Sequence, residues 1–220
     1  MDSSIFQFFP KKNIIFISFE GIEGCGKSTQ IKLLEKYLKQ NTDYQVHSFR
    51  EPGGTDFGEK LRSAMLNSDK KVAPLSEAHL FAASRCQLLT EKVLPLLNSD
   101  KNIVIYDRYT HSSIAYQGFG SKLGAKTVID IHKAAPLNYL PHLTFYLEID
   151  YQTSLQRQAS RNSKKDYFES KESDFHRDLI NGFDQMKNHF ETFHTVDGSK
   201  KLEEVHANII QRTLEIINEQ

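Results

Sequence analysis

The sequence predicts an α/β protein with a doubly wound, five-stranded parallel sheet and helices on both faces of that sheet. Strand-like segments alternate with helical patterns along the chain. The first strand-like segment, "NIIFISFE", is an almost continuous apolar run, which is typical of a strand buried on both faces of a parallel sheet. A glycine-rich stretch, "GIEGCGKST", joins this segment to the first helical pattern.

Length and composition indicate one domain, residues 13–220, preceded by an extension of residues 1–12 that we expect to be loose or weakly packed. Lysine plus arginine and aspartate plus glutamate each number 28, whereas a general nucleic-acid binder usually carries a basic excess. The cysteines, Cys25 and Cys86, show no pairing pattern, which fits a reducing cytosol. No stretch approaches the roughly 18 apolar residues of a membrane span. We therefore expect a cytoplasmic protein that binds neither nucleic acid nor a membrane.

The expected strands are rich in β-branched and aromatic residues and are separated by turn residues or helical patterns. In chain order they are 13–20, 44–50, 102–107, 143–150 and 193–198.

Helical patterns fill most of the connections. The helix after the glycine-rich stretch carries Ile31, Leu34 and Leu38 on one face. The segment 108–124 is expected to be a loop. Further helices are expected over 56–66, 75–97, 125–135 (ended by Pro136), 151–190 (broken around 161–166), and at the C-terminus with Leu202, Val205 and Ile209 on one stripe.

The glycine-rich stretch has the spacing of a phosphate-binding P-loop: Gly21, four residues, then Gly26-Lys27-Ser28. Glycines let the backbone N–H groups of residues 23–28 point inward, where they and the helix N-terminus form an anion cradle. Lys27 is expected to reach the β- and γ-phosphates of ATP, and Ser28 to ligate Mg²⁺. The strand before it and the helix after it argue against a chance glycine turn. The predicted ATP-binding residues are Gly21, Ile22, Glu23, Gly24, Cys25, Gly26, Lys27, Ser28 and Thr29.

The residues that end the third strand indicate which kind of P-loop protein this is. The Asp-x-x-Gly and Asn-Lys-x-Asp motifs of GTPases do not occur in the sequence. Coupling ATPases usually carry an acidic pair here, but this strand ends in Asp107 followed by Arg108. An arginine next to the carboxylate that faces the metal ion suits a site that holds a second, phosphorylated substrate. The pattern favours a nucleotide kinase.

Four strings make the sequence resemble the thymidylate kinase family: "FEGIEGCGKSTQ", "REPGGT" at 50–55, "LFAASR" at 80–85 and "DRYTHSSIAYQG" at 107–118. They occur in the family's order, and the resemblance covers roughly residues 13–218. It implies the fold of P-loop nucleoside monophosphate kinases with a short mobile lid. It also implies transfer of the γ-phosphate of ATP to dTMP, giving dTDP and ADP, with Mg²⁺ as cofactor. Members of the family are commonly homodimers, so a homodimer is expected.

The resemblance assigns residues to the acceptor nucleotide. Arg50 would hold its 5′-phosphate, a role that suits the bidentate donors of arginine. Phe81 and Arg85 lie four residues apart on one helix face; Phe81 would stack on thymine and Arg85 would donate to its O4. Apolar spacing alone would instead make Phe81 a core residue. The other assigned residues are Ser113 at the base N3, Tyr116 and Gln117 at the sugar and base, and Glu23 at the 3′-OH.

Three residues are predicted to be catalytic: Lys27, Arg108 and Arg161. Asp107 is assigned with Ser28 to Mg²⁺, and Arg108 to the acceptor phosphate. A closing segment must exclude water, and the charged break within residues 157–172 has the composition of such a lid, although an ordinary solvated loop remains an alternative. Relatives with an acidic P-loop residue usually carry a second lid arginine where this chain has Tyr167. Arg161 is therefore the expected lid catalyst, with Lys164 or Lys165 as a weaker substitute.

Other classes stay open at this stage. The chain could phosphorylate another nucleotide or a deoxynucleoside, or it could be a regulatory module that binds nucleotide without turnover. The presence of Lys27, Ser28, Asp107 and Arg108 argues against the inactive module. A metalloprotein is disfavoured, because the nine histidines are scattered and show no ligand spacing.

Overall fold

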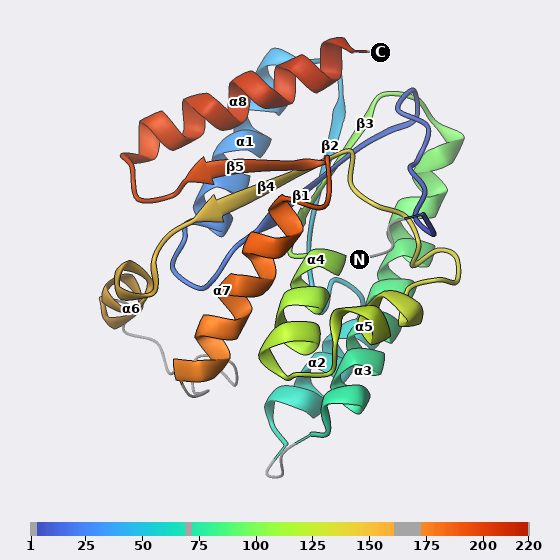
Figure 1. Cartoon of the computed structure of the whole chain (residues 1–220). Coiled ribbons are helices and arrows are strands. Elements are labelled where there is room, and N and C mark those ends of the chain that lie inside the picture. Colours follow the sequence, from blue (N-terminus) through green and yellow to red (C-terminus); the bar gives the residue numbers. More distant parts are fainter. Residues whose placement is uncertain (1–3, 69–71, 161–172, 220) are drawn as a thin grey trace.

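The five strands form one parallel sheet in a computed structural model that describes residues 4–68, 72–160 and 173–219. The strand order is β2-β3-β1-β4-β5, with β1 at the centre, where Ile17 lies opposite Ile105 of β3 and Leu143 of β4. Figure 1 shows the sheet between its helices. The strands are β1 (Ile14–Glu20), β2 (Gln45–Arg50), β3 (Asn102–Asp107), β4 (Leu143–Glu148) and β5 (Phe193–Asp197).

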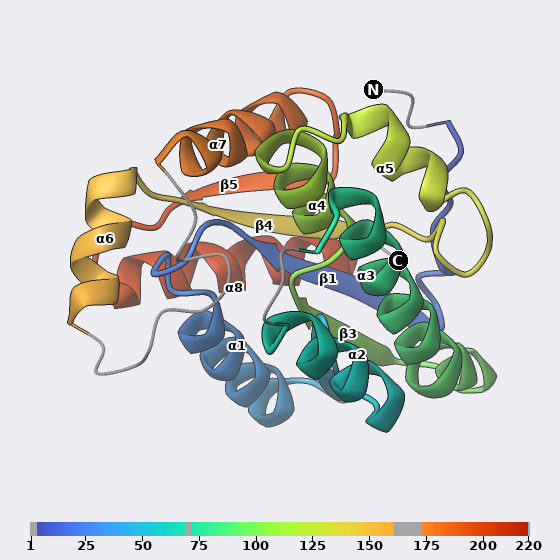
Figure 2. The same cartoon turned by 90° about the horizontal axis from the view of Figure 1, so that it is seen from below.

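Helices cover both faces, so the predicted fold class is confirmed. Figure 2 shows α1 and α8 on one side of the sheet and α4, α5 and α7 on the other. A π-helical segment, η3 (Ile114–Gly120), continues α4, and α7 packs against it. The α-helices are α1 (Lys27–Asn41), α2 (Asp56–Leu66), α3 (Pro74–Leu88), α4 (Thr110–Ser113), α5 (Ala125–Ile131), α6 (Tyr151–Ala159), α7 (Ser173–Lys187) and α8 (Leu202–Asn218).

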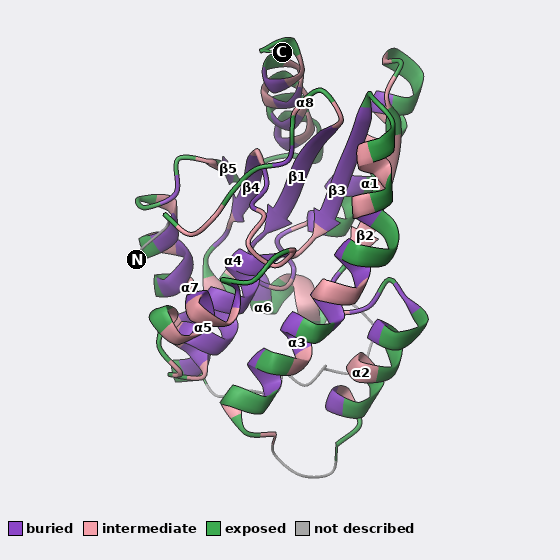
Figure 3. Cartoon of the chain, turned by 90° about the vertical axis from the view of Figure 1, so that its right-hand side faces the viewer, coloured by how far each residue is buried: buried purple, intermediate pink, exposed green. Residues whose placement is uncertain are grey.

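The central strand is buried on both faces, as its apolar run predicts. All seven residues of β1 are buried, and Figure 3 shows β1, β3 and β4 buried beneath helices with exposed outer faces. Ile15 and Ile17 join a core cluster that includes residues of α1 and α8, whereas Ile14 and Phe16 join a second cluster. Successive side chains of a strand point to opposite faces, so β1 contributes to both clusters.

The predicted first helix is confirmed, because Ile31, Leu34 and Leu38 are all buried. In α8 the stripe is shorter than predicted: Val205 and Ile209 are buried, but Leu202, the first residue of the helix, is 46% exposed. The long pattern 75–97 is helical throughout. Beyond Leu88 it changes to a π-helical turn (Leu89–Val93) and then a 3₁₀ turn (Leu94–Asn98).

The expectation of a loop over 108–124 is wrong, because residues 110–120 are helical. The buried carboxylate of Glu20, at the end of β1, accepts hydrogen bonds from the backbone N–H groups of Tyr109 (2.8 Å) and Ser112 (3.3 Å). It thereby satisfies donors that a helix N-terminus leaves without intrahelical partners. This cap comes from a residue about ninety positions away, so the local sequence carries no sign of it.

The expectation that residues 1–12 pack loosely is wrong in part: among residues 4–12, which the structure describes, Phe8 is 49% exposed but Phe9 is buried. Phe9 is 2% exposed, and its ring stacks on that of Tyr139 with 3.9 Å between the centroids. Gln7 donates its backbone N–H to the carbonyl of Asn138 (2.9 Å) and accepts from the N–H of Leu140 (2.8 Å). Apolar burial and backbone pairing therefore fix this segment on the segment that precedes β4.

Within the residues that the structure describes, no helix combines the length and the apolar character that a membrane crossing requires.

Candidate active site

A cavity of about 240 Å³ lies at the carboxyl ends of β1, β2 and β3. This is the usual place for ligands in open α/β sheets. The cavity brings together most of the residues that the sequence analysis assigned to donor and acceptor. Those that line it are Glu23, Gly24, Gly26, Lys27, Ser28, Thr29, Arg50, Phe81, Arg85, Asp107, Arg108, Ser113, Tyr116 and Gln117.

Three predicted ATP-binding residues, Gly21, Ile22 and Cys25, are not among the lining residues. All three are buried. Gly21 has a φ of 135°, and a Cβ there would lie 2.6 Å from the carbonyl oxygen of Leu147. Gly21 therefore has a structural reason to be glycine, namely the close approach of the loop to β4.

Lys27 is the first residue of α1, and its side chain reaches back to the P-loop. Its ammonium donates to the carbonyl oxygens of Gly21 (2.9 Å) and Ile22 (3.2 Å) and lies 3.5 Å from the sulfur of Cys25. Gly26, with a φ of 100°, precedes it as the N-cap of α1. The positive charge is thus held inside the curve of the loop, where a phosphate group would enter.

Ser28 and Asp107 meet at the beginning of α1 and the end of β3. The Ser28 hydroxyl donates to Asp107 Oδ2 at 2.8 Å. A hydroxyl next to a carboxylate, both on the wall of a phosphate-binding cavity, fits Mg²⁺, which typically takes one or two protein oxygens together with water and substrate phosphates. No group of three or more histidine, cysteine, aspartate or glutamate side chains placed to hold a metal occurs in residues 4–68, 72–160 and 173–219.

Arg108 is held by several partners at once. Its guanidinium pairs with Glu23 of the P-loop and donates to the carbonyl of Gly21 (3.1 Å) and to Ser112 Oγ (3.2 Å). It also lies over the ring of Tyr116, 4.8 Å from the centroid. The backbone of Arg108 is left-handed, with a φ of 72°. The guanidinium is therefore fixed between the P-loop and the acceptor side of the cavity.

Arg50 ends β2, where its Cα lies opposite that of Asp107 in the neighbouring strand. Its guanidinium is half exposed and pairs with Glu59 of α2 at 3.3 Å. An exposed pair of this kind contributes little energy. Arg50 therefore remains available to an incoming phosphate.

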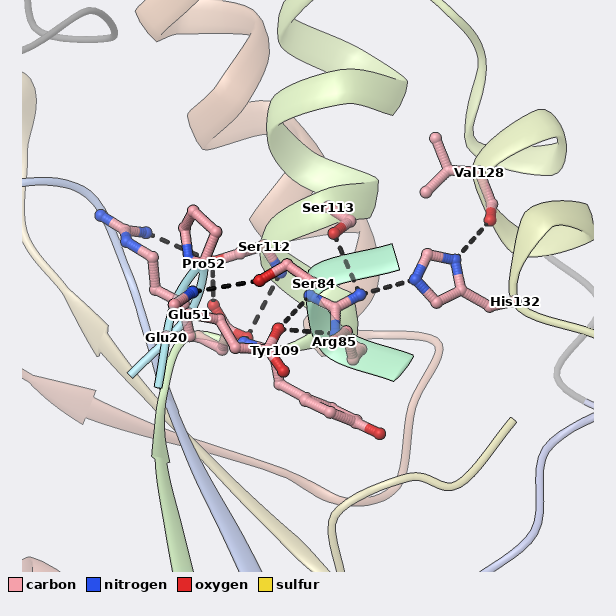
Figure 4. A network of polar contacts seen from close by, with 12 residues as sticks. Glu20, Glu51, Pro52, Ser84, Arg85, Tyr109, Ser112, Ser113, Val128 and His132 are labelled. Carbon is pink, nitrogen blue, oxygen red and sulfur yellow. Dashed lines mark hydrogen bonds and ion pairs between the residues drawn. The ribbon is translucent and has the colours of Figure 1, made fainter. Parts of the chain in front are cut away.

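Arg85 lies at the opposite end of the cavity, in a buried polar network (Figure 4). Its Nε donates to Glu51 Oε2 (2.6 Å), and Nη1 donates to Ser113 Oγ (3.1 Å) and His132 Nε2 (2.6 Å). Burial raises the pKa of Glu51 to about 7, against the lowering effect of Arg85. Because the carboxylate offsets the guanidinium charge, Arg85 is better suited to a neutral carbonyl than to a phosphate.

Phe81 and Gln117 complete this end of the cavity. Phe81 is 9% exposed, and neither core cluster of the described residues includes it. Gln117 donates its side-chain N–H to Glu77 Oε1 at 2.8 Å. Because a carboxylate accepts hydrogen bonds, this contact fixes the orientation of the amide. Gln117 Oε1 is buried and has no hydrogen-bond partner among the described residues.

The sequence analysis missed several residues that position the site. Glu51 lies within "REPGGT", a string that it interpreted as a turn apart from Arg50. Glu20, whose pKa burial raises, could have been suspected as an acidic residue ending a buried strand. Nothing in the sequence pointed to His132, or to Glu77 one helical turn before Phe81.

Arg157 is another residue that the sequence analysis did not single out. It donates to the carbonyl oxygens of Gly24 (3.2 Å) and Gly198 (2.9 Å), so it ties the P-loop to the turn after β5. Arg157 belongs to α6, which continues to Ala159 into the range predicted for the lid. The other predicted lid residues, Arg161, Lys164, Lys165 and Tyr167, lie outside the described residues.

Comparison with known proteins decides the family, since a family model for thymidylate kinase matches residues 19–209. The chain belongs to the thymidylate kinase family. A thymidylate kinase of Thermoanaerobacter sp. (strain X514) is 40% identical over 196 residues, which cover 89% of this chain and 95% of the relative. One from Caldanaerobacter subterraneus subsp. tengcongensis is 37% identical over 203 residues, or 92% and 96% of the two chains.

The fold agrees with this family. A crystal structure of thymidylate kinase from Ehrlichia chaffeensis matches with a TM-score of 0.73 at 27% identity, and the match covers 92% of this chain and 99% of that one. The predicted family, fold class and enzyme class are therefore confirmed: this member of the thymidylate kinase family is a kinase.

Proposed function

We propose that the chain transfers the γ-phosphate of ATP to dTMP, giving dTDP and ADP. The observation that carries this proposal is a single cavity with a P-loop at one end and a buried, charge-balanced polar network beside Phe81 at the other. The first end suits a nucleoside triphosphate and the second a neutral base. Arg50 and Arg108 line the same cavity as the P-loop residues and Phe81.

On the donor side, Lys27 and the loop N–H groups bind and orient the β- and γ-phosphates. The Lys27 ammonium would leave the carbonyl oxygens of Gly21 and Ile22, at least in part, to contact phosphate. Ser28 and Asp107 would hold Mg²⁺, which supplies charge neutralisation at the β- and γ-phosphate oxygens. The protein contributes alignment and electrostatic stabilisation, because phosphoryl transfer needs little covalent help from the enzyme.

On the acceptor side, Arg50 and Arg108 bind the dianionic phosphate of dTMP. Without such cations the acceptor phosphate would repel the triphosphate, and the two reacting groups could not approach. Arg108 already contacts Gly21 and Glu23 of the P-loop, so a phosphate bound to it lies beside the donor site.

At the base end, Phe81 would stack on thymine and Arg85 would donate to its O4. Ser113 accepts a hydrogen bond from Arg85 and has a second lone pair for the base N3–H. A guanidinium has no acceptor, so Arg85 cannot pair with the 4-amino group of cytosine. Tyr116, under Arg108, would crowd a ribose 2′-OH, and Gln117 would contact the base or sugar.

A coupled assay of ADP release tests this assignment, with dTMP, dUMP, dCMP, UMP and thymidine as acceptors and a reaction without acceptor as control. We expect dTMP to give the highest kcat/KM and thymidine, which lacks a phosphate for Arg50 and Arg108, almost none. Faster turnover of dCMP or UMP would contradict the base assignment. ATP binding without ADP release would indicate the regulatory module.

The Mg²⁺ requirement, a homodimer and a cytoplasmic location remain predictions of the family resemblance. EDTA titration of turnover tests the metal, and sedimentation equilibrium tests the dimer. The roles expected of Arg161, Lys164 and Lys165 in the lid also remain predictions.

A further inference from the structure

His132 lies directly after α5 and is fully buried, at 0% exposure. Its side chain reaches across to Arg85 on α3, which is distant in the sequence but adjacent in the network of Figure 4. The sequence analysis assigned no role to it. Two observations indicate its role. One is the pattern of donors and acceptors around its ring, and the other is that most hydrogens of the Arg85 guanidinium already have acceptors within the protein.

The contacts of His132 determine its tautomer. Nε2 lies 2.6 Å from Arg85 Nη1, and Nδ1 lies 2.7 Å from the carbonyl oxygen of Val128. A guanidinium can only donate and a carbonyl can only accept. Nε2 must therefore carry the lone pair and Nδ1 the proton, so the ring is neutral. Burial, followed by the charge of Arg85, lowers the pKa of His132 to about 3, in agreement with this state.

The Arg85 guanidinium has few hydrogens left for a ligand. The hydrogen on Nε goes to Glu51, and Nη1 donates to both Ser113 and His132. Nη2 lies 2.5 Å from Glu51 Oε2 and makes no other ion pair or hydrogen bond in the described part of the chain. Nη2 is therefore the nitrogen that can offer a hydrogen to a bound base.

We propose that His132 is the positioning residue for Arg85: by accepting from Nη1, it fixes the guanidinium so that Nη2 serves the base-binding end of the cavity. This inference rests on the proposed function, in which Arg85 contacts the acceptor base. His132 itself does not line the cavity, so it acts through Arg85 alone.

Removing the imidazole acceptor leaves an Nη1 hydrogen without a partner in a buried site, which is unfavourable. The guanidinium then has a reason to turn about its side-chain bonds, and Glu51 Oε1, which is buried without a partner among the described residues, offers an alternative acceptor. The Nη2 hydrogen that is offered to the base would then move with the guanidinium. ATP binding at the P-loop involves none of these atoms.

The test compares His132→Leu, which removes both polar atoms, with His132→Gln, whose side-chain oxygen can accept at about the position of Nε2. His111→Leu is the matched control, because His111 is also a fully buried histidine but has no hydrogen bond to a site residue. If the leucine variant does not fold, His132→Met replaces it, since methionine adapts to irregular space.

We expect His132→Leu to raise KM for dTMP about tenfold or more while KM for ATP stays within twofold. His132→Gln should recover most of the dTMP affinity. The kcat/KM ratio of dTMP to dCMP should fall in His132→Leu and be unchanged in His111→Leu. Equal effects of His132→Leu and His111→Leu on all three quantities would overturn the proposal.

A double-mutant cycle separates this inference from the proposed function. Arg85→Lys keeps the charge beside Glu51 but loses the planar donors. If Arg85→Lys weakens dTMP binding and His132→Leu adds nothing to it, the two residues act as one unit, as proposed. If Arg85→Lys weakens dTMP binding and His132→Leu alone does not, the positioning role is wrong while the function stands. A normal KM for dTMP in Arg85→Lys would contradict the base assignment itself.

Discussion

Glu23 of the P-loop and Arg108, which directly follows β3, form an ion pair. The pair links the loop that we propose cradles the donor phosphates to the arginine assigned to the acceptor phosphate. Contacts within the protein thus orient Arg108, so the guanidinium loses little side-chain entropy when it binds a phosphate.

Arg108→Lys should fold and lose about a hundredfold or more in kcat/KM for dTMP. A lysine presents a single charged group and cannot contact Glu23, Ser112 and an incoming phosphate in the fixed geometry of a guanidinium. Steady-state kinetics with circular dichroism checks this. Arg212→Lys, a surface arginine paired with Glu215, is the control and should behave as wild type. Activity of Arg108→Lys within tenfold of wild type would show that a point charge suffices.

Lys27→Ala should leave the fold intact and remove nearly all turnover, because a preorganised charge aimed at the transferring phosphoryl group is worth about a hundredfold or more in rate. The lost contacts to the carbonyl oxygens of Gly21 and Ile22 should lower the melting temperature slightly. The measurement is ADP release together with thermal unfolding. A folded variant with more than about a tenth of wild-type turnover is incompatible with the catalytic assignment.

Phe81→Ala should weaken dTMP binding, while ATP affinity barely changes. Loss of a base–aromatic stack costs roughly 1–3 kcal/mol in nucleic-acid complexes, and the same range is expected here. Calorimetric titration with each nucleotide separately provides the test. If both affinities fall together with the melting temperature, Phe81 supports the core rather than the base.

Arg161→Ala should slow single-turnover phosphoryl transfer much more than it weakens ATP binding, because a lid arginine stabilises charge that develops during transfer. Lys164→Ala and Lys165→Ala should have smaller effects. Rapid quench of a single turnover, with ATP affinity measured separately, distinguishes the two effects. Normal turnover in all three variants would mean that the positive charge near the donor comes from another residue.

The free energy of unfolding should fall at acid pH, in part because of His111. Burial, followed by the charge of Arg85, lowers the pKa of His111 from 6.5 to about 3, and neither ring nitrogen has a hydrogen-bond partner in the described part of the chain. Below pH 6.5 the unfolded chain binds a proton that the folded chain does not. The free energy of unfolding should therefore decrease by about 1.4 kcal/mol per pH unit as the pH falls from 6.5 towards 3.

Comparison with His111→Leu isolates this contribution. Glu51 acts in the opposite sense: its raised pKa stabilises the folded state below about pH 4.5, and this stabilisation is lost as the pH rises through about 7. The contribution of Glu51 cancels in the difference between the two proteins. Between pH 7.5 and 5, urea unfolding should show that the wild type loses about 2 kcal/mol relative to the variant. A constant difference would mean that His111 takes up its proton at the same pH in the folded and the unfolded chain.

The parts of the fold that the sequence predicts are those that local pattern determines. The apolar run of β1, the glycine spacing of the P-loop and the stripe of Ile31, Leu34 and Leu38 each reflect neighbours along the chain. These signals were sufficient for the sheet, for its helices other than the one at 110–120, and for one end of the cavity.

What the sequence did not predict depends on contacts between distant segments. The helix at 110–120 begins on the carboxylate of Glu20, and Phe9 is buried because it meets Tyr139. His132 gains its role when α5 and α3 place its Nε2 against Arg85. No local periodicity encodes such pairings. The family strings located Arg85, but its fixed orientation depends on residues outside those strings and on Glu51.

The left-handed backbone of Arg108 has a consequence for how this protein can be altered. A residue with a side chain adopts that conformation at a cost of about 1–3 kcal/mol, which glycine does not incur. Glycine at position 108 would relieve this backbone cost but would also remove the guanidinium and its contacts with Glu23 and Ser112. Engineering of this enzyme therefore has to screen turnover together with heat tolerance, because a substitution that relaxes the backbone here also removes the charge beside the P-loop.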